Sequence, residues 1–600
     1  MKRLGMMLLL AAAIAAPCAA QAVDVQAFVK KDRFNDIKLS PNGDYYAATV
    51  AMEDRTSLAI LRRSDNKVTA GFSLGKNTYV DEFVWVNPER VLISVAEKYG
   101  ELDNPQGTGE LYAVSVNGDP EILVGYRVHG EGLGTLIKTK KVENVAASLV
   151  DDLPADDRNV VISAMPFAYD PYTRAERMDV YSGRRTRIAS APVRNADFFT
   201  DNQGVVRFAN GADADNVRKL FYRKGEGAEW QLLSHEGIDG HREWPLGFSA
   251  DNQTAYLEVE QAEGPNAIIA FDVATQTRKE LLRDKVADPG KVIYRNGTKT
   301  PLGVFFMDRK PRTVFFDTAT PEARLYRGLE AAFGADAVRI TSQTSDGKLA
   351  LVQVWGDRNP GDFYIFDTVA KKAEYLLSRR DWLDPEKLAS SRAIELAARD
   401  GLSLHGFVTV PTGSEGKNLP LVVMPHGGPF ELQDVWGFDS EVQMLANAGY
   451  AVLQLNYRGS GGYGRAFTQA GALQWGKTMQ DDLTDATHWA IDQGIADPKR
   501  VCIYGASYGG YAALMGVVRE PALYRCAAGY VGVYDLPMMH TSGDVQRRGS
   551  GETYLREWIG EPEALGAVSP NRMADRIKVP VFLAAGGEDE RAPIEHSKRM

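Results

Sequence analysis

A serine lies between a strand-like and a helix-like segment late in the chain, and this arrangement limits the folds open to the sequence. The apolar run Arg500-Val501-Cys502-Ile503-Tyr504 leads directly into Gly505-Ala506-Ser507-Tyr508-Gly509, and helix-compatible residues follow at 512–516. So tight a turn forces Ser507 into strained backbone angles, and the flanking glycines leave room for the neighbouring backbone. Because the serine oxygen then projects above a sheet, the segment predicts a nucleophile elbow rather than a plain tight turn.

Residues 385–600 have the pattern of a doubly wound, mostly parallel sheet. Buried-type runs at 419–424 and 451–455 alternate with helical segments, of which 481–493 is the clearest and ends at Gly494. Such alternation is typical of parallel strands covered by helices. A G-x-S-x-G motif alone is weak evidence, but within this pattern it predicts an α/β-hydrolase domain over residues 385–600.

The residues after the run at 419–424 are suited to binding a developing negative charge. They are Pro425-His426-Gly427-Gly428-Pro429, and a side chain in place of glycine here would block the approach of a substrate carbonyl. We expect the backbone amides of Gly428 and Tyr508 to form the oxyanion hole. For His426 the sequence leaves three roles open: it contacts substrate, orients the loop, or is simply structural.

A different pattern, of short β-like runs and turn dipeptides, fills residues 30–380. A turn-and-strand unit recurs at 39–46, 85–92, 199–206, 248–257 and 342–349, and its closing strand recurs at 270–275 and 364–368. Several repeats are spaced by about 45–50 residues, as propeller blades are, although the repeat is blurred between about 100 and 190. A pair of β-sandwiches is the alternative. We favour a β-propeller of about seven blades over residues 23–384.

The N-terminus has the features of a signal peptide. Lys2 and Arg3 precede an apolar run at 4–16, and Ala20-Gln21-Ala22 offers small residues for cleavage, so residues 1–22 are expected to be removed. This predicts a periplasmic or secreted protein. The run is shorter than the ~20 apolar residues that span a bilayer, and no later stretch reaches that length. We therefore expect no membrane insertion after cleavage.

Charge and cysteine content exclude further classes. The net charge is -10 and the two signs are interspersed, which argues against a nucleic-acid or anionic-membrane surface. After cleavage only Cys502 and Cys526 remain, too few for a disulfide framework. The two would pair if strands brought them together, but two buried, unpaired cysteines are the favoured interpretation.

Three motifs together resemble the prolyl oligopeptidase family of serine peptidases. They are Ser507 with its Tyr508-Gly509-Gly510-Tyr511 tail, His426-Gly427-Gly428-Pro429, and Asn456-Tyr457-Arg458-Gly459-Ser460-Gly461-Gly462-Tyr463-Gly464. The His-Gly-Gly-Pro form is most similar to acylaminoacyl peptidases and the related dipeptidyl peptidases. The resemblance implies cleavage of peptide bonds in short peptides, in dipeptidyl, acylaminoacyl or oligopeptidase mode, with the propeller restricting access. Acyl transfer of this kind needs no metal or cofactor.

The resemblance also implies further site residues. It places the triad acid on Asp589, in the loop after the apolar run at 579–585, where Glu588 and Glu590 are the local competitors. By position Met538 and Met539 would line an apolar substrate pocket, although paired methionines are also common in cores.

The triad histidine is the part that the sequence does not supply. The triad order in α/β-hydrolases is Ser, Asp, His, and only His596 follows Asp589. It comes too soon after the acid to lie on the separate loop that presents the base, so we expect it to be a surface histidine. The base is expected beyond Met600, in a natural protein that continues for several tens of residues.

Two rival functions remain at this level. An esterase would use the same triad, because fold does not settle substrate. A binding protein that keeps the propeller and has lost catalysis is the second. Homo-oligomerisation is left open.

Overall fold

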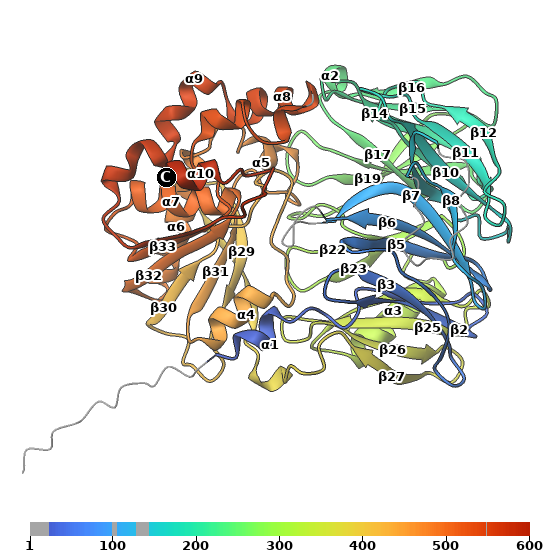
Figure 1. Ribbon diagram of the computed structural model, residues 1–600, viewed down its shortest axis with the longest axis horizontal. Coiled ribbons are helices and arrows are strands. Elements are labelled where there is room, and N and C mark those ends of the chain that lie inside the picture. The colour runs from blue at the N-terminus through green and yellow to red at the C-terminus, as the bar shows by residue number, and fades with distance from the viewer. Residues whose placement is uncertain (1–22, 99–104, 128–142, 548) are drawn as a thin grey trace, which may run out of the picture.

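The computed structural model describes residues 23–98, 105–127, 143–547 and 549–600, and shows two domains side by side (Figure 1). One is a β-propeller and the other an α/β domain, as predicted. The predicted signal peptide at 1–22 lies outside the described residues. Within the described part, no helix has the length and apolar character needed to cross a membrane.

Seven antiparallel sheets form the blades of the propeller, which confirms the predicted count. Within the described residues, six of the seven blades have four strands. Blade 6 has three, because the chain there continues into helix α3 (Pro321–Ala332). The strands by blade are β1 (Ile37–Leu39), β2 (Tyr45–Ala51), β3 (Thr56–Arg62), β4 (Lys67–Phe72); β5 (Thr78–Asn87), β6 (Arg90–Glu97), β7 (Gln106–Ser115), β8 (Glu121–Val124); β9 (Val145–Asp151), β10 (Asn159–Pro166), β11 (Arg174–Asp179), β12 (Arg185–Ser190); β13 (Asp197–Thr200), β14 (Val206–Ala212), β15 (Arg218–Tyr222), β16 (Gln231–His235); β17 (Glu243–Phe248), β18 (Thr254–Val259), β19 (Ala267–Asp272), β20 (Arg278–Arg283); β21 (Val292–Tyr294), β22 (Pro301–Phe306), β23 (Arg312–Phe315); and β24 (Ala337–Gln343), β25 (Leu349–Trp355), β26 (Asp362–Asp367), β27 (Lys372–Ser378). A short helix, α2 (Glu236–Asp239), follows the fourth blade.

The recurring turn of the sequence is the hairpin between the first two strands of a blade. In blades 1, 5 and 7 a hydroxyl residue opens it: Ser40, Ser249 or Thr344. Each hydroxyl accepts from the amide five residues later, at 2.9–3.1 Å, and the same two residues also pair through their backbones. The repeat therefore exists because one side chain closes the same turn in several blades.

The propeller closes by side-chain packing, because every blade is built from strands consecutive in sequence. Leu39 of β1 packs with Leu351 and Phe363 of the seventh blade in one buried cluster. The Leu39 amide also donates to the Ser342 hydroxyl of β24 at 2.9 Å.

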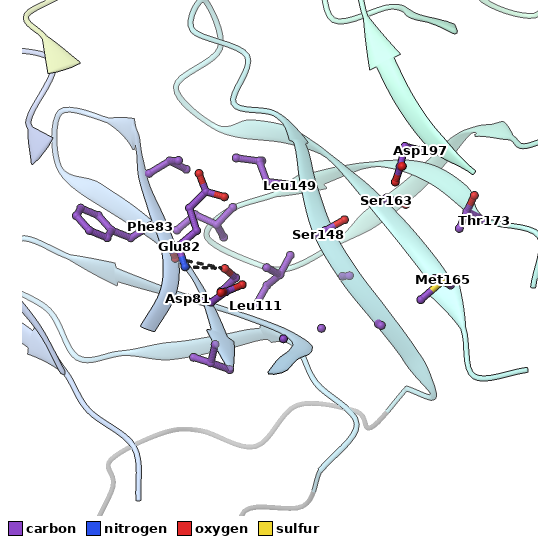
Figure 2. A pocket seen from close by; sticks show the side chains of 18 of the residues that line it. Asp81, Glu82, Phe83, Leu111, Ser148, Leu149, Ser163, Met165, Thr173 and Asp197 are labelled. Carbon is purple, nitrogen blue, oxygen red and sulfur yellow. Dashed lines mark hydrogen bonds between the residues drawn. The ribbon is translucent and has the colours of Figure 1, made fainter. Parts of the chain in front are cut away.

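A cavity of about 350 Å³ opens between blades 2 and 3 (Figure 2). Asp81, Glu82 and Asp197 lie on its wall, and the Glu82 amide donates to the Ser94 hydroxyl at 3.1 Å. No basic residue is among its described lining residues.

The α/β domain is built on a seven-stranded sheet in the order β28-β29-β31-β30-β32-β33-β34. The neighbouring strands from β31 to β34 all pair in parallel. The β28–β29 and β29–β31 pairs are antiparallel. The elements are β28 (Ser391–Ala397), β29 (Ser403–Thr409), β30 (Leu419–Val423), α4 (Ser440–Asn447), β31 (Ala451–Asn456), α5 (Arg465–Gln469), α6 (Thr478–Asp492), β32 (Ala496–Ala506), α7 (Tyr508–Arg519), β33 (Cys526–Tyr530), the 3₁₀ helix η2 (Leu536–His540), α8 (Gly549–Tyr554), α9 (Pro562–Leu565), β34 (Val581–Ala584) and α10 (Glu595–Arg599).

The chain reverses its direction of travel across this sheet at β30. From β30 it crosses through α4 to β31 on one side, then returns through α6 to β32 on the other. Since parallel crossovers are right-handed, α4 covers one face and α6 the opposite face, where α7 packs against it. The carboxyl ends of β30 and β32 are therefore neighbours at a topological switch point, where α/β proteins bind ligands.

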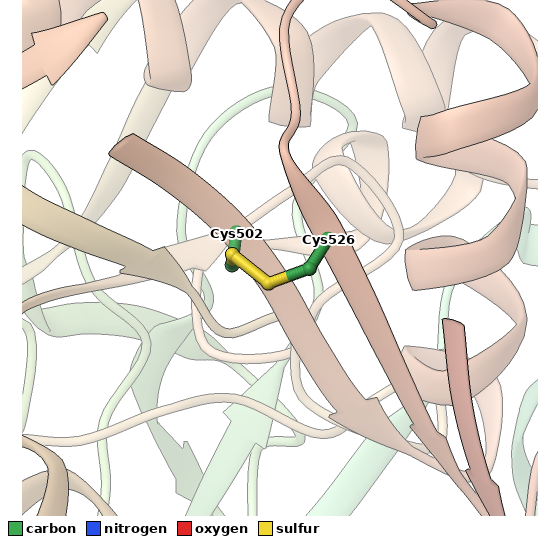
Figure 3. Close-up of a disulfide and its surroundings, with 2 residues drawn as sticks. All are labelled: Cys502 and Cys526. Carbon is green, nitrogen blue, oxygen red and sulfur yellow. A yellow bond between two sulfur atoms is a disulfide. The ribbon is translucent and has the colours of Figure 1, made fainter. Parts of the chain in front are cut away.

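A disulfide joins Cys502 on β32 to Cys526 on β33 (Figure 3). The favoured interpretation of the sequence, two unpaired buried cysteines, is wrong. The parallel register sets Cys502 directly opposite Cys526, with Cα atoms 4.8 Å apart, and that distance is within bonding range.

The first described helix, α1 (Val25–Val29), packs against the α/β domain rather than the propeller. It contacts α4, and its carbonyls at Ala27 and Phe28 accept from Trp382 and Arg380 in the connection between the domains. The N-terminal segment thus joins the second domain although the propeller follows it in sequence (Figure 1).

Candidate active site

Ser507 occupies the sharp turn that the sequence predicts. β32 ends at Ala506 and α7 begins at Tyr508, so the serine is the only residue between them, with φ 56° and ψ -119°. That left-handed conformation is rare for a residue with a side chain and marks a strained functional turn. It is stabilised by the amide of Ser507, which donates to the Tyr530 carbonyl of β33 at 2.9 Å.

The glycines around Ser507 are required by close packing. A Cβ atom on Gly505 would lie 2.5 Å from the backbone of Gly509, inside the 3.0 Å that real Cβ atoms keep. A Cβ atom on Gly509 would overlap the Pro425 carbonyl oxygen. The elbow therefore adopts this geometry without backbone displacement only with glycine at both positions, and the loop after β30 lies directly against it.

That loop holds Gly428, one of the two residues predicted for the oxyanion hole. The register of β30 with β32 sets Val423 opposite Ile503, so continuing both strands brings Gly427 beside Ser507. A Cβ atom on Gly427 would lie 3.5 Å from the Ser507 Cβ, and Gly428 follows in the same turn with φ 115°. Tyr508 is the first residue of α7, so its N–H has no acceptor within the helix. Gly428 and Tyr508 as donors stay a prediction.

His426 is held by the protein through both ring nitrogens. Nδ1 lies 2.7 Å from the Gly427 carbonyl, Nε2 lies 2.9 Å from the Ser460 hydroxyl, and the ring stacks on Tyr457. The Tyr457 hydroxyl donates to the His426 carbonyl at 2.7 Å. Burial lowers the pKa of His426 to about 4, so the ring is neutral at pH 7. Of the roles left open, these contacts favour orienting the loop.

Residues 456–464 carry the third motif, and their sequence by itself indicates no role for them. The Arg458 guanidinium binds the buried Asp482 carboxylate of α6 at 2.7–3.1 Å and also reaches Asp400. The Arg458 amide donates to the same Asp482 carboxylate at 2.9 Å. This pair fixes the segment that carries Tyr457 and Ser460, and through them His426.

Asp589 lies in the loop after β34, at the same edge of the sheet as Ser507. One strand, β33, lies between β32 and β34, and the Val531 amide donates to the Ala584 carbonyl at the end of β34. Oδ1 of Asp589 accepts from the amides of Arg591 and Ala592 at 2.9 and 2.8 Å, and Oδ2 has no partner within the described residues. Of its competitors, Glu588 is exposed and Glu590 pairs with Arg547. Asp589 as the triad acid stays a prediction.

The expectation of a surface His596 is wrong, because α10 packs this side chain into the domain. His596 is 1% exposed, its Nδ1 accepts from the Asp535 amide at 3.2 Å, and burial lowers its pKa to about 4. A buried ring that holds a backbone amide is structural. Within the described residues, no histidine is hydrogen-bonded to Ser507 or Asp589.

Met538 and Met539 lie in η2, beyond β33. Met538 is 4% exposed, and Met539 is partly buried and packs against the core of the domain. Their burial favours the core alternative that the sequence left open, and a role in a substrate pocket stays a prediction.

A cavity of about 610 Å³ lies between the domains, bordered by Phe430 and Glu431 just after the oxyanion loop. Its aromatic wall consists of Phe430, Tyr554 and Trp558, with the rings of Phe430 and Trp558 centred 4.8 Å apart. The propeller contributes Glu236, Arg242 and the segment 215–218. The volume is in the range of small-molecule sites. The sequence did not predict this aromatic wall, because Phe430 and Trp558 are far apart in the chain.

Ion pairs across this cavity join the two domains. Arg242 of the propeller binds Glu431 at 2.8 Å, and Arg465 of the α/β domain binds Glu236 and Glu260 at 3.0 and 2.9 Å. Burial raises the pKa of the nearby Glu258 to about 7. In the described part of the chain, no group of three or more His, Cys, Asp or Glu side chains is arranged to hold a metal ion.

The fold and this site define a propeller-bearing α/β-hydrolase with a serine elbow, and comparisons with known proteins agree. Residues 436–600 match the sequence profile of the prolyl oligopeptidase family. Dipeptidyl aminopeptidase BIII of Pseudoxanthomonas mexicana is 30% identical over 440 residues, which cover 71% of this chain and 63% of that protein. The acylamino-acid-releasing enzyme of Sus scrofa is 29% identical over 202 residues, 32% of this chain and 28% of that protein. The chain is therefore similar to the prolyl oligopeptidase family, and residues 436–600 match its profile.

A solved structure has the same fold. The puromycin-hydrolyzing peptidase of Mycobacterium tuberculosis superposes with a TM-score of 0.70 at 19% identity, over 97% of this chain and 90% of that chain. The chain spans 63% of the length of dipeptidyl aminopeptidase BIII and 59% of that of dipeptidyl peptidase family member 6 of Caenorhabditis elegans. Both values are less than two thirds.

Proposed function

We propose that this protein is an exported serine peptidase that hydrolyses peptide bonds in short peptides. The observation that carries the proposal is Ser507, strained at the elbow, with the loop of Gly427 and Gly428 directly beside it. The interdomain cavity supports short substrates, because a bound peptide would lie between the propeller and the α/β domain.

The proposed reaction is acyl transfer in two steps. Ser507 Oγ attacks the peptide carbonyl carbon while its proton passes to a general base, and the Gly428 and Tyr508 amides stabilise the oxyanion. The leaving amine takes the proton as the C–N bond breaks, and water then attacks the acyl-enzyme to release the acid. Asp589 would hold the base, which we propose to be a histidine. Without a base, triad enzymes lose ~10⁴–10⁶ in rate.

Labelling by a fluorophosphonate tests the nucleophile. The full-length protein is expected to be labelled on Ser507, and Ser507→Ala is not. Absence of labelling in the folded wild-type protein would favour the inactive binding protein.

A substrate panel separates the peptidase from the esterase. Aminoacyl and dipeptidyl p-nitroanilides, their N-acylated forms and short acyl esters are compared. Turnover of free-amine anilides indicates a dipeptidyl mode, and turnover of acylated ones an acylaminoacyl mode. Hydrolysis of the esters alone would sink the peptidase proposal.

Export is supported by the N-terminal pattern and by the Cys502–Cys526 disulfide, since such bonds persist in oxidising compartments. Sequencing the N-terminus of protein from the periplasm or medium is expected to give Val23. An intact Met1 would argue against cleavage.

A further inference from the structure

A second interdomain cavity, of about 290 Å³, lies between blades 6 and 7 and residues 435–438 of the α/β domain. Those residues follow the oxyanion loop by only a few positions. The cavity shares no lining residue with the larger interdomain cavity described above. Its polar wall comes from the propeller: Lys291 beside β21, Arg339 on β24, Gln353 on β25, and Arg379 just after β27.

The polar groups of this wall are mostly hydrogen-bond donors. Gln353 stands opposite Arg339 in the sheet, and its amide oxygen accepts from the Arg339 guanidinium at 2.7 Å. Gln353 is 5% exposed, and its amide nitrogen has no partner within the described residues. Nε of Arg379 is buried without a partner, while its terminal nitrogen donates to the Asn35 carbonyl. One buried donor, Nε of Arg379, is thus left unsatisfied at this cavity, which is costly unless a ligand accepts from it, and the Gln353 amide nitrogen on the same wall has a donor to spare.

The positive charge here has no direct ion-pair partner in the protein, although Asp36 acts on all three basic groups at longer range. Within the described residues none of Lys291, Arg339 and Arg379 forms a salt bridge, and no carboxylate lines the cavity. Asp32 is paired with Arg380 and Asp36 with Lys38. Asp336 and Asp362 accept from the side-chain amide of Asn359, which lines the cavity. Burial lowers the pKa of all three basic groups, and for Lys291 the neighbouring Arg339 and Arg379 add to the effect.

The remaining wall is apolar. Phe305, Trp355 and Trp436 line the cavity, and the Arg339 guanidinium lies 5.9 Å from the Trp355 ring centre. An apolar wall strengthens charge interactions and suits an organic anion better than a strongly hydrated inorganic one. Two guanidinium groups favour a planar carboxylate, which accepts two parallel hydrogen bonds from such a group.

We infer that this cavity binds a carboxylate, and that its occupant is the C-terminal carboxylate of a peptide held between the domains. The peptide source rests on the proposed function, whereas carboxylate binding itself does not. Lys291, Arg339, Arg379 and the Gln353 amide donate to the carboxylate, and the aromatic side chains contact the last residue of the peptide.

Calorimetric titration of the folded Ser507→Ala protein tests the inference without any turnover. A free-acid tripeptide, Ala-Ala-Phe, is compared with its C-terminal amide at constant ionic strength. The acid is expected to bind about 10- to 100-fold more tightly than the amide, because the amide cannot form the charge-assisted hydrogen bonds of a carboxylate. Arg339→Gln and Arg379→Gln are each expected to remove most of this preference. The matched control is Arg33→Gln, an exposed arginine paired with Asp381 outside the cavity, which should keep it.

Several outcomes would overturn the assignment. Equal binding of acid and amide, or a preference that survives both arginine substitutions, contradicts it. If phosphate displaces the peptide acid more effectively than acetate does, the site takes an inorganic anion and the carboxylate is wrong. Lys291 is the most exposed of the three basic residues, so Lys291→Gln keeps the fold if the arginine changes do not. It is expected to weaken the preference for the acid, and an unchanged preference contradicts its role. A protein that fails to label at Ser507 but prefers the acid loses the proposed function and keeps this site.

Discussion

Gly509→Ala tests how closely the oxyanion loop depends on the elbow. The added Cβ atom would lie about 1 Å closer to the Pro425 carbonyl oxygen than the 3.0 Å that real Cβ atoms keep. Neither atom belongs to a flexible side chain, so the backbone of the loop or of α7 must move by about that much. A displacement of ~1 Å near reacting groups costs about 10²-fold in rate. Overpacking of this kind also costs about 1–3 kcal/mol of stability.

The assay is the rate of fluorophosphonate labelling of the full-length protein, with thermal unfolding measured in parallel. Gly509→Ala is expected to fold, to unfold at a lower temperature and to label about 10²-fold more slowly. The control is Gly328→Ala on α3, where an added Cβ meets nothing within 4 Å and labelling should not change. If Gly509→Ala labels and unfolds as the wild type does, the loop does not pack against Gly509 as closely as described, and the reasoning is refuted.

Three further changes test the supports of the site. Asp482→Ala leaves the Arg458 guanidinium partly unpaired in the core and is expected to lower the free energy of unfolding in urea by about 3–5 kcal/mol. The control is Asp481→Ala, which breaks more exposed ion pairs and should lower it by less than about 1 kcal/mol. Equal losses in the two variants would contradict the argument. The double change Cys502→Ser and Cys526→Ser opens a loop with a sequence separation of 24 and should cost about 2–4 kcal/mol, seen as a lower unfolding temperature that reductant no longer changes. Burial raises the folded-state pKa of Glu258 from 4.5 to about 7, so wild-type stability is undiminished below pH 4.5 and falls as pH rises to 7. Glu258→Gln should gain up to about 3 kcal/mol over wild type across that window, and a gain independent of pH would exclude the titration as its cause.

Much of the architecture could be predicted because it rests on local patterns. The strand, the turn of Ser507 and the helix after it are adjacent in sequence, so residue type and spacing identify them together. The propeller repeat was recognisable for the same reason, since Ser40, Ser249 and Thr344 each close a turn within a few residues. The mostly parallel sheet followed from alternating strands and helices, although the helix predicted at 481–493 begins earlier, at Thr478.

What the sequence could not determine depends on register and on contacts between distant segments. Cys502 and Cys526 pair because β32 and β33 are neighbours in one register, and a shift of one residue between the strands would place the two cysteines on opposite faces of the sheet. His596 was expected at the surface, but the docking of α10 onto the segment of Asp535 buries it. Neither fact leaves a pattern in the residues around it.

Sequence alone therefore determined the turn that carries Ser507 and the two-domain plan, because strand, helix and turn preferences act over a few residues. Only the tertiary structure decided what surrounds Ser507: the loop of Gly427 placed by β30, the Tyr457 and Ser460 contacts that hold His426, and the cavities between the domains. The reason is physical. These groups come from strands and loops far apart in the chain, and their positions are set by packing and charge only once the two domains meet.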